Sequence, residues 1–334
     1  MIKQGLPDSV NIIKAPNHHL QQSLRDAVAD GFQKTPKSIP ALFFYDTPGS
    51  QLFEQICKLS EYYPTRTEHK ILTDNAQDII TTVTGEIELV ELGSGSSAKT
   101  RILINAILVD QPHLHYIPTD ISTEFLIESS IVLKNEYEPL SITAIAAEHS
   151  DALRLLPERS SQSRLFLFLG SNIGNFEPEA AIDFIGQIRC QMRKEDRLLI
   201  GFDLVKDHQV LFDAYNDKAA ITAEFNKNLL TRINRELGGD FKLDLFDHYA
   251  PFVEEHSRIE MRLISRCVQR IYVAGLEEVF NFGEGEFIHT ENSYKYTVEG
   301  FGSLCEMAGL KMTEYYLDER GWFAVGLLRE AGGG

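Results

Sequence analysis

The chain has 334 residues, 43% of them hydrophobic and 24% charged, a composition typical of a folded globular protein and unlike that of disordered or fibrous chains. The formal net charge of −17 argues against a nucleic-acid partner, because contacts to phosphates require a basic surface. The length predicts about two domains, since a single domain usually has about 100 to 200 residues.

Neither a metal site nor a membrane segment is predicted. The four cysteines are far apart and form no Cys-x-x-Cys pair, and the histidines form no His-x-His or His-Glu-x-x-His motif. No apolar run approaches the roughly 18 residues that a membrane span requires, and the N-terminus leads into no apolar signal segment. We therefore expect a cytoplasmic protein with reduced cysteines and no membrane contact, and a monomer is the expected state.

In chain order, the most informative stretch is the apolar run 87–92, followed by Gly93-Ser94-Gly95 and then by a helical pattern from Thr100. It is preceded by a predicted helix at 68–80. Glycines allow the chain to bend sharply and let backbone N–H groups approach a ligand at the start of a helix. The stretch 93–98 also fits the dinucleotide fingerprint, whose third small residue can be alanine. Nucleotide-type cofactor binding is the favoured interpretation, and an ordinary tight turn is the alternative.

Beyond this turn, apolar runs typical of strands alternate with helical patterns. Ser122 is expected to cap the first of the helices. The alternation predicts an α/β fold with a doubly wound parallel sheet, whose ligands bind beyond the carboxyl ends of the strands. Strands are predicted at 114–120, 141–147, 164–169 and 197–202, and helices at 123–136 and 178–192.

The last predicted elements are two strands, 311–318 and 322–328, joined by residues 319–321 as a β-hairpin. A parallel sheet of five strands closed by an antiparallel β-hairpin is the layout of class I S-adenosylmethionine-dependent methyltransferases. A dinucleotide-binding sheet normally ends in another parallel unit, so the dinucleotide interpretation is the weaker one.

The segment between the fifth strand and the hairpin is longer than a single crossover helix, predicted at 298–308, requires. It contains a helical pattern at 218–237 ended by Gly238, and alternating stretches at 257–264 and 271–273 that predict antiparallel strands. We therefore predict a discontinuous α+β substrate-binding domain from 10–66 with 204–295, an S-adenosylmethionine-binding methyltransferase domain from 67–203 with 296–330, and a flexible tail at 331–334.

Several polar residues directly follow the predicted strands. Asp120 lies 27 residues after Gly93, where a carboxylate can accept both ribose hydroxyls, and a charge beside the start of the next helix is the alternative. The turn 170–175 offers the amides of two asparagines to a polar small molecule, or it is simply turn-forming. The other carboxylates at strand ends are Glu91, Glu148 and Asp203.

A second group of candidates lies outside the predicted parallel sheet. Glu291 and Ser293 would lie on one side of an extended segment, since side chains alternate along a strand. From spacing alone, a solvated surface pair is the favoured explanation. Tyr45, Tyr62 and Tyr215 are each, taken singly, expected to be packing residues.

Blocks of sequence along most of the chain carry a resemblance to a known family. They are residues 45–46, 49–50, 52–53, 61–68, 90–95, 99–101, 168–175, 203–207, 259–263 and 290–291, with Ser293. Together they resemble the histidine-specific Nα-methyltransferases of ergothioneine biosynthesis, which make the trimethylated betaine hercynine. The resemblance extends from about residue 41 to residue 328.

The resemblance implies S-adenosylmethionine as methyl donor, S-adenosylhomocysteine as product and L-histidine as the small-molecule substrate. The cofactor site would consist of Tyr45, Gly93, Ser94, Lys99 and Asp120. The substrate site would consist of Phe53, Tyr62, Gly170, Asn175, Tyr215, Met261, Glu291 and Ser293. Tyr45 and Asn175 would be the catalytic residues, Asn175 and Tyr215 would hold the substrate carboxylate and amine, and Glu291 and Ser293 would bond the imidazole.

Two positions depart from the common pattern of the family. Ala147-Glu148-His149 stands where the family commonly has Gly-Asp-Phe beside the adenine, so Glu148 and His149 are expected in the cofactor site. Asn172 replaces a common threonine beside the substrate amine.

Two further interpretations stay open beside a histidine methyltransferase. The chain could methylate another aromatic amino acid, such as tryptophan or tyrosine. It could also be a non-catalytic cofactor-binding paralogue, which the intact glycine loop and Asp120 disfavour. The number of methyl groups added and the proton acceptor are not fixed by the sequence.

Overall fold

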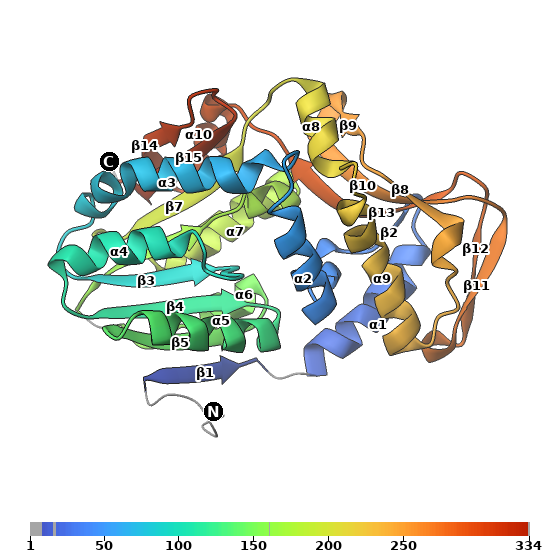
Figure 1. The fold of residues 1–334 in the computed structure, drawn as a ribbon, viewed down its shortest axis with the longest axis horizontal. Helices are drawn as coiled ribbons and strands as arrows, with labels where there is room; N and C mark the ends of the chain where they lie inside the picture. The colour runs from blue at the N-terminus through green and yellow to red at the C-terminus, as the bar shows by residue number, and fades with distance from the viewer. Residues whose placement is uncertain (1–8, 16–17, 160, 333–334) are drawn as a thin grey trace. The chain divides into compact units, whose positions relative to one another are not determined.

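The computed structural model describes residues 9–15, 18–159 and 161–332 (Figure 1). Unit 1, one of two compact units, comprises Met1–Ala15, Pro64–Val205 and Lys295–Gly334, and unit 2 comprises Pro16–Tyr63 and Lys206–Tyr294. The end of the predicted tail, residues 333–334, and the first eight residues, for which no signal segment is predicted, lie outside the described residues.

Unit 1 is built on an eight-stranded sheet in the order β1-β5-β4-β3-β6-β7-β15-β14. Neighbouring strands pair in parallel, except that β15 runs antiparallel to both β7 and β14. The predicted doubly wound parallel sheet that ends in an antiparallel β-hairpin is confirmed. The strands are β1 (Val10–Lys14), β3 (Ile87–Leu92), β4 (Leu114–Asp120), β5 (Leu140–Ala146), β6 (Ser163–Phe168), β7 (Arg197–Asp203), β14 (Leu310–Leu317) and β15 (Phe323–Glu330).

Helices cover both faces of this sheet (Figure 1). Strand β3 shows why both faces need a cover of helices: all six of its residues are buried, and alternate residues pack on opposite faces of the sheet. Leu89 belongs to the apolar core of one face, and Val90 and Leu92 belong to the core of the other. Helices α3 (Tyr63–Thr81), α4 (Thr100–Asp110) and α5 (Thr123–Glu136) cover the first face, and α6 (His149–Arg154), α7 (Pro178–Gln191) and α10 (Val298–Met307) cover the second.

Strand β1 corrects the predicted domain division, which placed residues 10–14 in the second domain. The strand instead pairs in parallel with β5 at the edge of the unit 1 sheet, from Val10 beside Ile142 to Lys14 beside Ala146. Val10 and Ile12 are buried in the core there. The apolar side chains of this short strand gain burial only on a sheet whose neighbouring strand is more than a hundred residues away in the sequence.

Unit 2 is an α+β assembly around a mixed sheet in the order β2-β13-β10-β8, with β9 also paired to β10. A separate two-stranded sheet joins β11 and β12. The predicted antiparallel strands at 257–264 and 271–273 are confirmed as β10 and β11. The strands are β2 (Lys37–Ser38), β8 (Phe246–Tyr249), β9 (Phe252–Val253), β10 (Arg258–Ser265), β11 (Gln269–Val273), β12 (Glu278–Phe282) and β13 (Phe287–Tyr294); the helices are α1 (His18–Phe32), α2 (Thr47–Ile56), α8 (His208–Tyr215) and α9 (Ile221–Leu237).

Local backbone conformation explains where the helices differ from prediction. Helix α9 begins at Ile221 rather than at 218, because Ala220 has a left-handed φ of 60°. Gly238 ends the helix at φ 64°, as predicted. Helix α3 begins five residues before its predicted start, with Pro64 in its first turn, where the missing N–H of proline costs no hydrogen bond.

Within the described part of the chain, no helix has the length and apolar character that crossing a membrane requires. The same residues contain no group of three or more His, Cys, Asp or Glu side chains placed to hold a metal ion.

Candidate active site

The glycine-rich loop after β3 is fixed to the end of β4. Gly93 and Gly95 have φ of 73° and 51°, in the left-handed region that glycine adopts without strain. The N–H groups of Gly93 and Ser94 both donate to the Thr119 carbonyl oxygen at 2.9 Å. The first loop amides therefore bind the neighbouring strand, and the loop has a defined shape without a ligand.

Asp120 holds the next part of this loop. Its Oδ2 accepts the Gly95 N–H at 3.0 Å, and its Oδ1 accepts the Ser122 N–H at 2.9 Å. Burial raises the pKa of Asp120, against the effect of these bonds. The expected side-chain cap from Ser122 is wrong: Ser122 occupies the N-cap of α5 but its hydroxyl makes no capping bond, and Asp120 binds its N–H instead.

Three buried polar atoms around this loop have no hydrogen-bond partner among the described residues. They are Ser94 Oγ, Thr119 Oγ1 and His149 Nδ1. A Cβ added at Gly93 would lie 3.1 Å from His149 Cε1, so the imidazole stands directly against the loop. Buried polar atoms normally have partners, and three unpaired ones beside a glycine loop fit a polar ligand such as a nucleoside cofactor.

The turn after β6 lies beside the same loop. Gly170 and Ser171 have left-handed φ of 83° and 58° and lead into the short 3₁₀ helix Asn172–Asn175. A Cβ at Gly93 would lie 3.3 Å from Asn172 Nδ2, and one at Gly170 would lie 3.4 Å from Lys99 Nζ. Within unit 1 the carboxyl ends of β3, β4 and β6 therefore meet, as predicted for a parallel sheet. Asn175 ends the 3₁₀ helix and is partly exposed.

Two of the carboxylates at strand ends are bound within unit 1. Glu91 is buried and accepts bonds from Thr100 Oγ1 at 2.6 Å and from the Tyr116 hydroxyl, and burial raises its pKa to about 7. Asp203 forms a fully buried ion pair with Lys295 Nζ at 2.8 Å. Both side chains therefore serve the structure of the strand ends.

Aromatic rings gather in unit 2. The ring centroids of Tyr45 and Phe53 are 5.8 Å apart, those of Phe53 and Tyr62 are 6.3 Å apart, and those of Tyr62 and Tyr215 are 6.2 Å apart. Burial, together with the neighbouring Tyr215, raises the pKa of Tyr62 well above its usual value. Tyr62 is therefore a neutral phenol at any physiological pH and can donate a hydrogen bond.

The strand pair β10 and β13 brings the polar candidates to this aromatic group. Met261 stands opposite Glu291 in the antiparallel register, and Ile259 stands opposite Ser293. Glu291 is 9% exposed and Ser293 is 4% exposed, so the explanation of a solvated surface pair is wrong. Ser293 Oγ and the Tyr215 hydroxyl are hydrogen-bonded at 2.7 Å. Unit 2 thus assembles buried rings, a carboxylate and a hydroxyl.

Known proteins match nearly the whole chain. The family model described as "Histidine-specific methyltransferase, SAM-dependent" matches residues 24–330. The chain belongs to this family. It is 40% identical over 305 residues to the histidine N-alpha-methyltransferase of Mycobacterium tuberculosis, covering 91% of this chain and 94% of that protein.

Two further relatives match this chain at lower identity. The chain is 31% identical over 288 residues to ergothioneine biosynthesis protein 1 of Neurospora crassa, covering 83% of this chain and 31% of that longer protein. It is 27% identical over 320 residues to the 4-dimethylallyltryptophan N-methyltransferase of Epichloe festucae var. lolii, covering 90% of this chain and 92% of that protein.

His149 is the clearest departure of this family member from the common Gly-Asp-Phe pattern. The imidazole packs edge to face on Phe168, with ring centroids 5.3 Å apart. Burial lowers its pKa to about 4, so the ring is neutral near pH 7 and has one donor and one acceptor. Glu148 is exposed and occupies the N-cap of α6 without a side-chain capping bond. Only His149 of this pair has an enclosed polar atom beside the loop.

Two residues of these clusters were not predicted. Phe225 of α9 lies 5.8 Å from Tyr45 and 6.0 Å from Phe53, ring to ring. Glu68 of α3 is fully buried and forms an ion pair with Lys99. Glu68 precedes the apolar Ile71 and Leu72 by three and four positions, so all three lie on the same face of the helix. A carboxylate on the apolar face of a helix is the sequence signal by which Glu68 could have been found.

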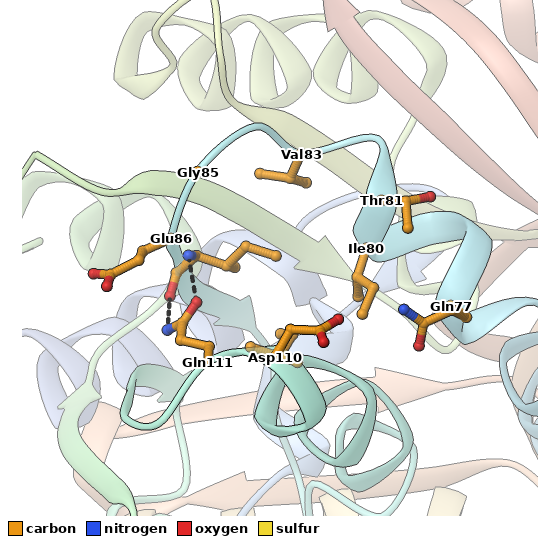
Figure 2. A pocket seen from close by; sticks show the side chains of 10 residues that line it. Gln77, Ile80, Thr81, Val83, Gly85, Glu86, Asp110 and Gln111 are labelled. Atoms are coloured by element: carbon orange, nitrogen blue, oxygen red, sulfur yellow. Dashed lines mark hydrogen bonds between the residues drawn. The ribbon is translucent and has the colours of Figure 1, made fainter.

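A hollow of about 400 Å³ lies away from the glycine loop, around the start of β3 (Figure 2). The side chain of Gln111 binds the backbone of Ile87 there, accepting from its N at 2.7 Å and donating to its O at 2.9 Å. Ligands of parallel sheets bind at the carboxyl ends of strands, and this hollow is at the amino end. It is lined by Gln77, Ile80, Thr81, Val83, Gly85, Glu86, Ile87, Ile107, Asp110 and Gln111.

Proposed function

We propose that this enzyme transfers methyl groups from S-adenosylmethionine to the α-amine of L-histidine, and that it forms the trimethylated betaine hercynine for ergothioneine biosynthesis. The observation that carries the substrate assignment is the buried pair Glu291 and Ser293, set among aromatic rings in unit 2. A carboxylate accepts hydrogen bonds from more than one donor, and an imidazole N–H can donate to it, whereas the side chains of phenylalanine and leucine cannot.

For the cofactor, we propose contacts from Gly93, Ser94, Lys99 and Asp120, with His149 in place of the usual family aromatic. The unpaired Ser94 Oγ and His149 Nδ1 support this assignment, because a nucleoside offers both donors and acceptors. The sulfonium methyl is already activated when the cofactor is bound. The enzyme's own residues therefore need only align the amine and exclude water. Tyr45 and Glu148 are further proposed cofactor contacts.

For the substrate, we propose that Glu291 accepts the imidazole N–H and that Ser293 bonds the second ring nitrogen. The Tyr215 hydroxyl, 2.7 Å from Ser293 Oγ, orients that serine. Tyr62, Phe53 and Met261 would enclose the ring.

The substrate backbone and its proton concern a different set of residues. Gly170 and Asn175, with Tyr215, are proposed to contact the amine and the carboxylate. An α-amine must lose a proton before it attacks. The raised pKa of Tyr62 keeps its phenol protonated near neutral pH. Tyr62 can therefore donate a hydrogen bond but is a poor proton acceptor. Tyr45 and Asn175 are the proposed catalytic contacts.

The second candidate is N-methylation of another aromatic amino acid. The relative named for 4-dimethylallyltryptophan shares 27% identity over nearly the same length, less than the 40% shared with the histidine N-alpha-methyltransferase. A cytoplasmic monomer that binds no nucleic acid or membrane is proposed from composition and charge alone.

Mass spectrometry of L-histidine incubated with S-adenosylmethionine and the enzyme tests this function. We expect trimethylated histidine and S-adenosylhomocysteine in a ratio of one to three. Products from tryptophan or tyrosine alone would favour the second candidate. Binding of S-adenosylhomocysteine without turnover of any amino acid would contradict the proposed function.

A further inference from the structure

Glu68 is a buried carboxylate for which the proposed chemistry gives no role. It lies in the second turn of α3 and is fully buried. Its carboxylate forms an ion pair with Lys99 Nζ and accepts the Gly170 N–H, at 2.9 Å to each of its two oxygens. One side chain thus binds both the end of the glycine loop and the start of the turn that carries Asn175.

The sheet leaves space for this carboxylate. A Cβ added at Gly201 of β7 would lie 1.9 Å from Glu68 Oε1, which is much closer than a Cβ atom comes to a non-bonded heavy atom. Glycine at this position therefore lets the carboxylate lie against the strand. A buried charge is costly unless it is paired and hydrogen-bonded, and Glu68 is both.

We propose that Glu68 is a positioning residue that fixes the Lys99 ammonium and the Gly170 turn in one arrangement, so that the cofactor loop and the substrate turn are aligned before ligands bind. The role of the Gly170 turn in substrate binding rests on the proposed function. The role of the glycine loop in cofactor binding rests on the family to which the chain belongs. A displacement of the attacking atom by about 1 Å can cost about 10²-fold in rate.

The test compares Glu68→Gln with Asp74→Asn. The amide of Glu68→Gln can still accept the Gly170 N–H but cannot pair with Lys99. Asp74 lies on the same helix in an exposed ion pair with Lys70, so Asp74→Asn removes an equal charge without touching the loop. The measurements are calorimetric Kd for S-adenosylhomocysteine, kcat and KM for histidine, and Tm.

We expect Glu68→Gln to raise the Kd by about tenfold and to lower kcat by about 10²-fold, while Asp74→Asn stays within twofold of wild type. A folded Glu68→Gln variant that loses Tm but keeps its Kd and kcat would overturn the proposal. If Glu68→Gln does not fold, Gly201→Ala displaces the carboxylate from the sheet side, and a folded Gly201→Ala variant with wild-type Kd and kcat would overturn it equally.

The calorimetric result stands even if the substrate is not histidine. Should wild type bind S-adenosylhomocysteine without methylating histidine, the proposed function fails, and the Kd of Glu68→Gln still decides whether Glu68 positions the cofactor loop. An unchanged Kd in that case overturns the proposal for Glu68 as well.

Discussion

The two clusters of candidate residues differ in how their polar groups are satisfied. Around the glycine loop of unit 1, Ser94 Oγ, Thr119 Oγ1 and His149 Nδ1 are buried and have no hydrogen-bond partner in the part of the chain that the structure describes. In unit 2, the Tyr215 hydroxyl and Ser293 Oγ are hydrogen-bonded at 2.7 Å, and the rings of Tyr215 and Tyr62 lie 6.2 Å apart. We therefore propose that the glycine loop binds a polar ligand through these atoms, and that the aromatic cluster selects its ligand by the chemistry of the ligand's ring.

The difference predicts distinct consequences for substitutions in the two units. Changes in the aromatic cluster should alter which amino acid reacts. Changes at the glycine loop should alter cofactor affinity and leave the choice of amino acid unchanged.

The largest effect is expected for Glu291→Ala. If the carboxylate bonds the imidazole, its removal should lower kcat/KM for histidine by a factor equivalent to about 2–5 kcal/mol, the usual loss for one partner of a buried charged contact. The Kd for S-adenosylhomocysteine should stay within twofold. A parallel loss of cofactor affinity would show that the two clusters are not functionally distinct.

Asn175→Ala should lower kcat by about 10²-fold, because an amide that aligns the substrate backbone controls the position of the attacking nitrogen. Cofactor affinity is expected to remain near wild type in calorimetry. Asp183→Ala, at an exposed position of α7 in the same unit, serves as the control. Wild-type kcat in a folded Asn175→Ala variant would remove Asn175 from the proposed site.

Asp120→Ala should weaken binding of S-adenosylmethionine by about 1–3 kcal/mol, the usual loss when a buried polar contact is removed. Part of this loss would come from the Gly95 and Ser122 N–H groups, which would lose their acceptor. Asp151→Ala, at a half-exposed site on the same unit, is the control. Unchanged affinity with an intact fold would refute the cofactor role of Asp120.

The smallest effect is expected for His149→Phe, which restores the common aromatic residue. The folded-state pKa of about 4 lies below the ordinary value of 6.5, so the unfolded chain binds the proton more strongly. The contribution of neutral His149 to stability is therefore complete above pH 6.5 and is lost as the pH falls toward 4. Denaturant unfolding from pH 7 to pH 4 should show a smaller decline for His149→Phe than for wild type, and equal declines would contradict the burial of this ring.

Sequence patterns predicted those features that depend on neighbours along the chain. The glycine loop at 93–95, the helix end at Gly238 and the closing hairpin were confirmed, because glycine conformation and periodicity are local signals. The burial of Glu291 was not predicted from spacing, because it depends on the strand register that places Met261 of β10 opposite Glu291 of β13.

The features that were missed depend on partners distant in sequence. Strand β1 needs β5, and the buried Glu68 needs Lys99 and the space above Gly201. Phe225 reaches Tyr45 and Phe53 only through the packing of α9 in unit 2. Spacing within one segment can mark a carboxylate on the apolar face of a helix, as at Glu68, but it cannot identify the partner of that carboxylate in another segment.

The central claim is that the buried carboxylate of Glu291 selects the imidazole of histidine. It is tested most directly by kcat/KM for histidine, tryptophan, tyrosine and phenylalanine with wild type and with Glu291→Ala. Sites built to bond a polar group reject analogues that lack it by about 10⁴-fold or more. The wild-type kcat/KM for histidine should therefore exceed that for phenylalanine or tryptophan by about 10⁴-fold, and Glu291→Ala should reduce this ratio. A wild-type preference for tryptophan or tyrosine, or histidine selectivity that survives the substitution, would contradict it.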